Sequence, residues 1–369
     1  MPIVKTKETM TARERVLAAF HHQPVDRVPI DYSSNPGIDR RLKERLGLAP
    51  DDGDGLRQAL GVDFAGVGAP YVGPKRFADI PDRRISQESG IRTRWIEHSN
   101  GDGYWDFCDF PLQNAGLEEI EAWPLATPDD YDYGALPDQC RRLTRYARHY
   151  GGAGLADIIN STGMVRGMEQ VLVDLITDDP AGLRLIDRKI ELQLEVMRRA
   201  LERIGDQIDF VWMGEDLGTQ IAPIISLELF RRHIRPRHQK FIDLATSYGL
   251  PVMTHTCGSS SWAYEDFIEM GVKAVDTLQP EAANMAPAYL KAKFGGRLAF
   301  HGCISTAGPV AYGTPADVER NVRETLEILM PGGGYMLSPS HQLQDNSPVE
   351  NVIALYQAAH RFGSGAVRR

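Results

Sequence analysis

The sequence predicts a (β/α)8 barrel with an N-terminal extension and a β-hairpin insertion. The chain has 369 residues, of which 42% are hydrophobic and 25% charged, a composition typical of a globular protein. Eight short apolar segments alternate with connections that usually contain a helix, and polar side chains follow several of these segments directly. We treat residues 1–369 as one domain. A doubly wound sheet is the alternative, because the two most N-terminal strands have weak patterns.

The first expected elements are a helix and two short strands. Thr11 and Glu14 have the spacing of a capping box and precede apolar residues at helical intervals, so a helix should start near Thr11 and end before Pro24. Strands are expected at 28–32 and 64–67, with a helical segment between them.

An insertion is expected at about residues 70–111. Two segments of strand-forming residues, 92–98 and 104–110, flank Ser99-Asn100-Gly101-Asp102-Gly103, which is typical of a hairpin turn. The pattern predicts a β-hairpin within the insertion rather than a separate domain.

Strand and helix patterns alternate through the rest of the chain. The clearest helix spans 180–204, with Asp179 at its N-cap and Gly205 after its end. The run 332–334 is all glycine but precedes a strand, so it predicts a turn rather than a phosphate loop. The other expected elements are strands at 155–159, 208–213, 251–255, 274–278, 298–302 and 335–337, and helices at 227–248, 262–270 and 315–329.

Composition excludes several functional classes. A net charge of −9 argues against nucleic acid as a partner, because nucleic-acid binding normally needs a basic surface. No apolar run has the length of a signal-peptide core or a membrane span, so we expect a cytoplasmic protein with no membrane partner. Four cysteines do not make a disulfide framework in so long a chain. Cys108 and Cys140 lack nearby His or Cys partners, and we interpret them as structural.

The pair His255 and Cys257 predicts a metal site. Both residues lie where a strand-like apolar run ends, and positions i and i+2 of a strand point to the same side. An imidazole and a thiolate together favour a soft cation such as zinc. A catalytic zinc needs a third protein ligand, and Cys303 and His341 are competing candidates, since each follows a later strand.

Further candidate residues follow the same rule, because barrel active sites lie at the carboxyl ends of the strands. Glu215 and Asp216 follow an apolar strand and are candidate catalytic acids or bases, with a metal ligand or a helix cap as alternative roles. The candidate substrate-binding residues share positions at or just after strands; they are Asp31, Tyr32, Asn160, Gln220, Gln279 and His301.

Several stretches together resemble the uroporphyrinogen decarboxylase superfamily, and in particular its corrinoid-linked methyltransferases. They are Thr11-Ala12-Arg13-Glu14-Arg15-Val16 with Arg27-Val28-Pro29, then 215–220, Thr254-His255-Thr256-Cys257-Gly258, Phe300-His301-Gly302-Cys303-Ile304, and Gly332-Gly333-Gly334-Tyr335 leading to His341. The resemblance covers nearly the whole chain. It implies a (β/α)8 barrel and, in the methyltransferases, zinc held by a His-x-Cys pair and a late cysteine.

The comparison with the family also shows departures. His341 stands at the late ligand position here, and Cys303 stands where many relatives have glycine. The decarboxylases carry an Arg-Gln-Ala-Gly-Arg segment that binds a polycarboxylate porphyrinogen, whereas residues 30–37 here contain no arginine. The resemblance therefore favours the methyltransferase branch.

The function expected from the resemblance is a zinc-dependent methyltransferase. It would move a methyl group between a small methylated substrate, with an O-methyl compound as a candidate, and a corrinoid on a separate protein or a thiol acceptor. The cofactors implied are Zn²⁺ and the partner's corrinoid, and relatives indicate a homodimer or a monomer bound to its corrinoid partner. The alternatives are a metal-independent decarboxylase and a non-catalytic barrel that binds a small molecule.

Overall fold

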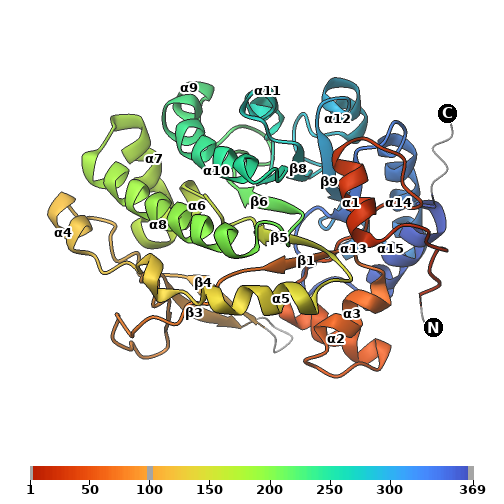
Figure 1. The fold of residues 1–369 in the computed structure, drawn as a ribbon, viewed down its shortest axis with the longest axis horizontal. Helices are drawn as coiled ribbons and strands as arrows, with labels where there is room; N and C mark the ends of the chain where they lie inside the picture. The colour runs from red at the N-terminus through yellow and green to blue at the C-terminus, as the bar shows by residue number, and fades with distance from the viewer. Residues whose placement is uncertain (1–2, 98–102, 365–369) are drawn as a thin grey trace.

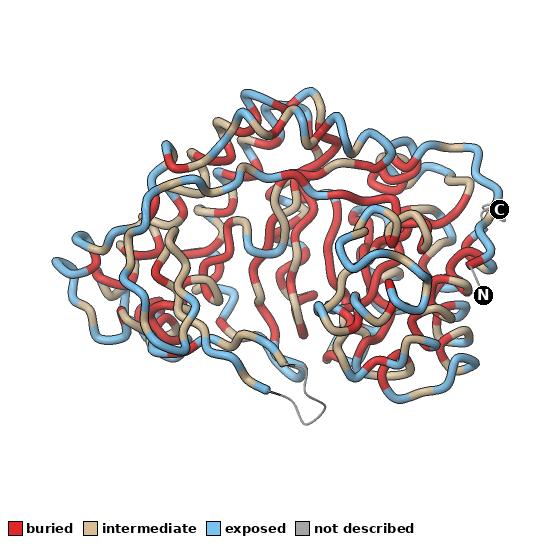
Figure 2. Tube along the Cα trace, turned by 90° about the horizontal axis from the view of Figure 1, so that it is seen from below, coloured by how far each residue is buried: buried red, intermediate tan, exposed pale blue. Residues whose placement is uncertain are grey.

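The centre of the molecule is a curled parallel sheet (Figure 1), in a computed structural model that describes residues 3–97 and 103–364. Seven strands follow one another in space in chain order, each parallel to the next. These strands are β1 (Phe64–Val67), β5 (Ala147–Gly151), β6 (Phe210–Gly214), β7 (Val252–Thr256), β8 (Ala274–Thr277), β9 (Ala299–Ile304) and β10 (Tyr335–Pro339). They are largely buried inside a layer of helices (Figure 2).

A short eighth segment lies between the last strand and the first. Leu337 in β10 donates to Pro29 O at 2.8 Å and accepts from Asp31 N at 2.9 Å, while Asp63, just before β1, donates to Ile30 O at 2.8 Å. Backbone hydrogen bonds therefore join this segment to both edge strands of the sheet. The predicted (β/α)8 class is confirmed, and the doubly wound alternative is wrong.

Helices cover the outside of the sheet (Figure 1). No helix among the described residues is both long and apolar enough to cross a membrane. The helices are α1 (Ala12–Phe20), α2 (Pro36–Leu46), α3 (Gly53–Leu60), α4 (Leu117–Ala122), α5 (Leu136–Arg142), α6 (Ile159–Arg166), α7 (Met168–Thr177), α8 (Pro180–Ile204), α9 (Leu227–Leu229), α10 (Arg235–Ser247), α11 (Tyr264–Met270), α12 (Pro287–Phe294), α13 (Pro309–Tyr312), α14 (Pro315–Leu329) and α15 (Val349–Phe362), with short 3-10 turns at Pro128–Asp130, Tyr133–Ala135 and Ser261–Ala263.

The predicted helix termini are confirmed at the strongest capping signals. Thr11 and Glu14 form the expected capping box of α1. The Asp179 side chain accepts from Gly182 N at the start of α8, which spans the predicted 180–204. The glycine run 332–334 forms the predicted turn before β10, with three consecutive positive φ angles of 78°, 75° and 78° that only glycine adopts readily.

The predicted helix 227–248 is divided into three parts. A π-helical segment, Phe230–Ile234, separates α9 from α10. Pro236 is the second residue of α10 and has no N–H to donate to the preceding turn, so the regular hydrogen-bond pattern cannot pass through it.

The strand predicted at 155–159 is wrong. The strand of this unit is β5 (Ala147–Gly151), and the apolar run that follows forms a buried loop that enters α6 at Ile159. β5 contains Arg148 and His149, which hid it in the sequence. His149 lies in the barrel against Phe210, with ring centroids 5.2 Å apart, so one of these polar residues is a core residue.

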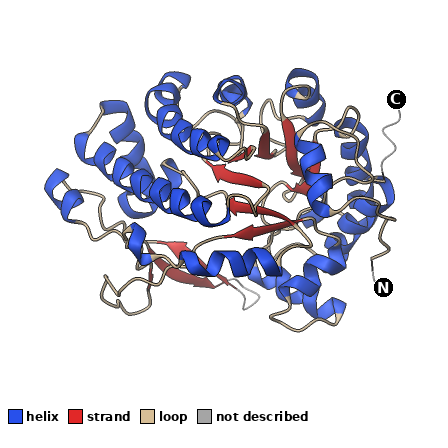
Figure 3. Cartoon of the chain, in the orientation of Figure 1, coloured by secondary structure: helices blue, strands red, loops and turns tan. Residues whose placement is uncertain are grey.

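The predicted hairpin forms part of a separate antiparallel sheet (Figure 3). Its strands are β2 (Arg84–Ile85), β3 (Arg92–Glu97) and β4 (Gly103–Phe107), with β3 paired to both others. Trp95 and Trp105 face each other across this pair, with ring centroids 5.7 Å apart. Residues 99–102 of the predicted turn lie outside the described residues, and its last residue, Gly103, begins β4.

A buried ion-pair network lies beside the segment that completes the barrel. Asp63 is 1% exposed and accepts from Arg15 at 2.6 Å, from Arg27 at 2.6 and 2.9 Å, and from Ile30 N at 2.8 Å. Arg15 also binds Asp26, at 2.6 Å. Burying these charges is tolerated because each has several partners. Arg15 and Arg27 of the N-terminal motif are therefore structural.

Candidate metal centre

His255 and Cys257 lie side by side at the carboxyl end of β7. His255 is the fourth residue of this strand, and Cys257 follows its last residue. The Cys257 Sγ lies 3.4 Å from His255 Nε2, so the two side chains point to the same side as the sequence predicts. Burial raises the pKa of the Cys257 thiol above its usual value, against the opposing effect of His255.

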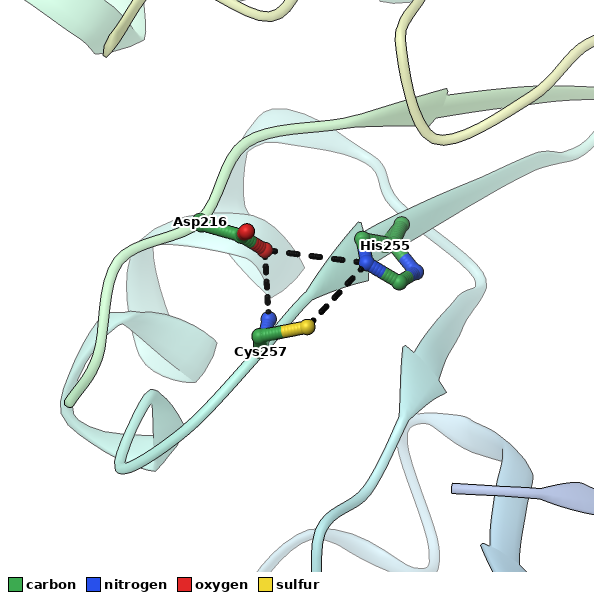
Figure 4. A group of neighbouring side chains, drawn as sticks. All are labelled: Asp216, His255 and Cys257. Carbon is green, nitrogen blue, oxygen red and sulfur yellow. Dashed lines mark hydrogen bonds and ion pairs between the residues drawn. The ribbon is translucent and has the colours of Figure 1, made fainter. Parts of the chain in front are cut away.

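Asp216 completes a cluster with this pair (Figure 4). It follows β6, the strand adjacent to β7, and its Oδ1 accepts from Cys257 N at 2.9 Å and lies 3.6 Å from His255 Nε2. One ligand atom from each of the three residues lies within 4.8 Å of the other two.

The donor set and its spacing fit zinc. Ligand atoms at about 2.0–2.3 Å from a tetrahedral zinc lie roughly 3.3–3.8 Å apart. The separations of 3.4 Å and 3.6 Å measured from His255 Nε2 fall in this range. Three ligands of types N, S and O would leave the fourth position for a substrate or water, which is the pattern of a catalytic site.

Asp276 in β8 fixes the orientation of His255. The two residues are register partners on neighbouring strands, and the Nδ1 of His255 donates to Asp276 Oδ2 at 2.5 Å. Burial disfavours the charged imidazole, but the charge and hydrogen bond of Asp276 raise the His255 pKa well above its usual value. With Nδ1 bound to a carboxylate, Nε2 is the nitrogen that faces Cys257 and Asp216. This carboxylate–histidine arrangement is the usual support of a metal ligand.

The sequence analysis missed Asp276. The signal was present: a single carboxylate in the apolar strand 274–277 must be paired when it is buried, and it is 3% exposed. Gln279, two residues beyond that strand, was chosen instead.

His301 is the second partner of Asp276. The two residues are register partners between β8 and β9, and His301 Nδ1 donates to Asp276 Oδ1 at 2.6 Å. Burial opposes the charged form, yet the charge and hydrogen bond of Asp276 and the nearby Asp31 raise the His301 pKa to about 9. The Nε2 of His301 lies 3.3 Å from Asp31 Oδ2 but has no aligned hydrogen-bond partner among the described residues. The two predicted substrate-binding residues Asp31 and His301 are therefore neighbours in the barrel.

Aromatic rings surround His301. Phe64 and Trp212 contact it edge-on, with centroids 5.3 Å and 5.4 Å away. His301 is therefore an interior residue with a largely apolar environment, except for its two carboxylate neighbours.

Glu215 and Asp216 have different positions although they are adjacent in the chain. Glu215 is fully buried and accepts from the backbone N–H groups of Ile158 and Ile159, at 2.8 Å and 3.0 Å, at the start of α6. Burial raises its pKa to about 8. Glu215 therefore has the position of a helix cap, one of the alternative roles that the sequence left open for it. Asp216 has the position expected of a ligand or a proton carrier, and Asn160 donates to its Oδ2 at 2.7 Å.

Gln220 and Gln279 form a polar pair at the rim of the site. Gln220 is exposed and donates to Gln279 Oε1 at 3.0 Å, and Gly258 N donates to the same oxygen at 2.7 Å. The predicted substrate-binding residue Gln279 therefore holds the loop that follows Cys257.

The two predicted third ligands lie outside the cluster of Asp216, His255 and Cys257. Cys303 is 1% exposed in β9, where its φ of +72° departs from regular strand geometry, and burial raises the pKa of its thiol. His341 is exposed, with its Nδ1 3.3 Å from Gln344 Nε2. Tyr32 is half-buried against Tyr356 and accepts from Ser34. The roles of these residues stay predictions.

The fold and the site together define a (β/α)8 barrel with a His, Cys and Asp cluster at the carboxyl ends of its strands. The sequence model of the uroporphyrinogen decarboxylase (URO-D) family matches residues 151–362, more than half of the chain. The chain belongs to this family.

Relatives and a solved structure extend the similarity over nearly the whole chain. A uroporphyrinogen decarboxylase of Alkalilimnicola ehrlichii is 24% identical over 366 residues, covering 95% of this chain and 94% of the relative. One from Actinobacillus succinogenes is 23% identical over 362 residues, covering 95% and 97%. A methyltransferase from Methanosarcina mazei has a similar structure, with a TM-score of 0.60 and 16% identity over 96% of this chain and 99% of the other. This last likeness shows a shared fold.

Proposed function

We propose that this protein is a zinc-dependent methyltransferase that moves a methyl group between a small methylated substrate and a corrinoid protein or thiol acceptor. The cluster of Asp216, His255 and Cys257, with Asp276 behind His255, carries the proposal. The family membership and the methyltransferase with a similar fold support it. We retain an O-methyl compound as the candidate substrate class.

Asp216, His255 and Cys257 are the residues that would hold zinc. When bound, zinc would act as a Lewis acid on the heteroatom that carries the methyl group, or lower the pKa of an acceptor thiol. The orientation of the cluster is supplied by the protein: Asp276 holds His255 by its Nδ1, and the amide of Asn160 holds Asp216. Asp31 and His301, joined to the cluster through Asp276, would bind polar atoms of a substrate.

Metal content is the first test. Protein purified without chelator should contain about one zinc per chain, and Cys257→Ser should lose it, whereas Cys108→Ser, in the insertion, should keep it. X-ray absorption would count the sulfur ligands of the bound zinc. One sulfur fits Asp216 or His341 as third ligand, and two sulfurs would assign Cys303 instead. Metal-free protein of native stability would overturn the proposal.

Activity is the second test. Zinc-loaded protein would be incubated with aryl methyl ethers or other O-methyl donors and a reduced corrinoid protein, and methylcobalamin formation followed optically. Methyl transfer by the wild type but not by Cys257→Ser would support a catalytic role. Bound zinc without transfer to corrinoid or thiol acceptors would favour a structural site.

A decarboxylase is the second candidate, because the curated relatives are uroporphyrinogen decarboxylases over nearly the whole chain. That function needs no His-x-Cys pair, and it predicts activity that survives Cys257→Ser. Two arginines of the N-terminal motif, Arg15 and Arg27, are buried against Asp63 and so do not face a polycarboxylate substrate. Release of CO2 from porphyrinogen substrates is the direct measurement.

A further inference from the structure

We propose that Asn160 is a positioning residue of the metal centre, which orients Asp216 as the third ligand. This inference rests on the proposed function, because it concerns the same cluster. The two carboxylate oxygens of Asp216 have different partners: Oδ2 accepts from the Asn160 side-chain amide at 2.7 Å, and Oδ1 accepts from Cys257 N at 2.9 Å. Hydrogen bonds to both oxygens restrict rotation of the carboxylate.

The orientation that results is the one a metal site needs. Oδ1 lies 3.6 Å from His255 Nε2, so it is the oxygen directed at the ligand pair, while Oδ2 is occupied by Asn160. The side chain of Asp216 is 25% exposed, and without Asn160 it would be free to turn toward solvent. Fixing a ligand before metal binding removes an entropic cost of ordering it.

Asn160 is itself held in place by the neighbour of Asp216 in the chain. It is the second residue of α6, and the start of this helix is bound by two carboxylates. Glu215 accepts from Ile158 N and Ile159 N, and Asp157 accepts from Ser161 N at 3.0 Å. These bonds satisfy N–H groups that a helix N-terminus otherwise leaves without partners.

The residues after β6 therefore act as a pair with opposite tasks. Glu215, fully buried, anchors the helix that carries Asn160, and Asp216, partly exposed, receives the Asn160 amide. The adjacent Glu and Asp of the sequence are an anchor and a ligand rather than two alternative acids.

The experiment measures zinc and cobalt(II) binding by the full-length chain. Zinc affinity would be measured by competition with a chromogenic chelator for wild type, Asn160→Ala and Asn160→Asp. The Asp variant keeps the shape of the side chain but removes the amide donor. We expect both variants to bind zinc about 10- to 100-fold more weakly, the usual cost of losing a residue that supports a ligand.

Ser161→Ala is the matched control. Ser161 lies on the same turn of α6, but its hydroxyl contacts Asp157 O and Lys189 rather than Asp216. Its zinc affinity should stay within about twofold of wild type. The visible absorption of cobalt-loaded protein gives a second measure, because loss or rotation of an oxygen ligand changes the ligand-field bands, whereas a general loss of stability does not.

The outcomes separate this inference from the proposed function. Wild-type protein that binds zinc, with Asn160 variants of equal affinity and unchanged cobalt spectra, would overturn the role of Asn160 and leave the metal centre intact. Wild-type protein that binds no zinc would overturn both. Glu215→Gln provides an independent variant: its NH2 group cannot accept, so one oxygen remains for the two N–H groups at the start of α6, and zinc binding should weaken in the same direction as in Asn160→Ala. Unchanged affinity in Glu215→Gln would contradict the anchoring step.

Discussion

Asp276→Asn should destabilise the barrel and loosen the metal centre together. The carboxylate accepts hydrogen bonds from His255 at 2.5 Å and His301 at 2.6 Å, and the charges of these two imidazoles lower its pKa to about 2 despite its own burial. An asparagine has one acceptor oxygen and an NH2 group, so it satisfies one histidine and places a donor against the other. A hydrogen bond to a charged group contributes about 1.5–3 kcal/mol, and removing one partner of a buried ion pair costs about 3–5 kcal/mol. We therefore expect the free energy of unfolding at pH 7 to fall by about 3 kcal/mol.

Urea denaturation with a chelator present measures this change without a contribution from metal. At about 3 kcal/mol per molar of urea, the midpoint should fall by about 1 M. Asp243→Asn, an exposed carboxylate on α10, is the control and should change stability by less than about 0.5 kcal/mol. Without chelator, zinc affinity of Asp276→Asn should fall about 10- to 100-fold. A variant with both the wild-type midpoint and the wild-type zinc affinity would refute the role of Asp276.

Three further outcomes follow from the geometry. Asp63→Asn removes a buried carboxylate bound to two buried arginines, so thermal unfolding should show a loss of about 3–5 kcal/mol, and an unchanged melting temperature would contradict the network. The pKa values of His255 and Cys257 are both raised, so zinc binding must displace protons from them. Zinc affinity should therefore increase with pH, and zinc addition should acidify a weakly buffered solution. Zinc binding that does not depend on pH would contradict these ligands. Burial lowers the pKa of His238 to about 4, so the folded state keeps it neutral while the unfolded state is protonated below its usual pKa of 6.5. The contribution of His238 to the free energy of unfolding is then complete above pH 6.5 and decreases by up to about 3 kcal/mol as the pH falls to 4. Urea titrations at several pH values should show a shallower decrease for His238→Gln than for the wild type.

The sequence predicted the parts of the site that depend on strand geometry alone. His255 and Cys257 were found because alternation along a strand determines which side chains share a side, and because strand ends meet at one end of a barrel. The position of Cys303 after a later strand also made it a candidate ligand, yet it lies outside the cluster of Asp216, His255 and Cys257, while His301, two residues earlier, contacts Asp276. Gly302 and Cys303 have φ angles of +107° and +72°, so regular alternation fails at this position, and the residue types alone do not reveal that.

The distinction between Glu215 and Asp216 could not be predicted from the sequence for a different reason. From the sequence alone, two adjacent carboxylates after a strand have equal access to a metal or a proton. The path of the loop between β5 and α6 determines which of the two binds the helix and which is left for the site. That loop was assigned to a strand at 155–159, which left no helix N-terminus for Glu215 to bind. The error in local structure therefore hid the role of a residue far away in the chain.

The residues of the centre that lie on strands are held more rigidly than Asp216, which follows a strand. His255, Asp276 and His301 are register partners on three neighbouring strands, so backbone hydrogen bonds set their spacing before any metal binds. Asp216 follows the strand β6, and its orientation depends on Asn160 and on the start of α6. A site built on strands keeps its geometry more precisely than one built on loops. His255 is therefore the most rigidly held residue of the proposed centre, whereas Asp216 keeps its orientation only through the hydrogen bonds of Asn160 and Cys257 N.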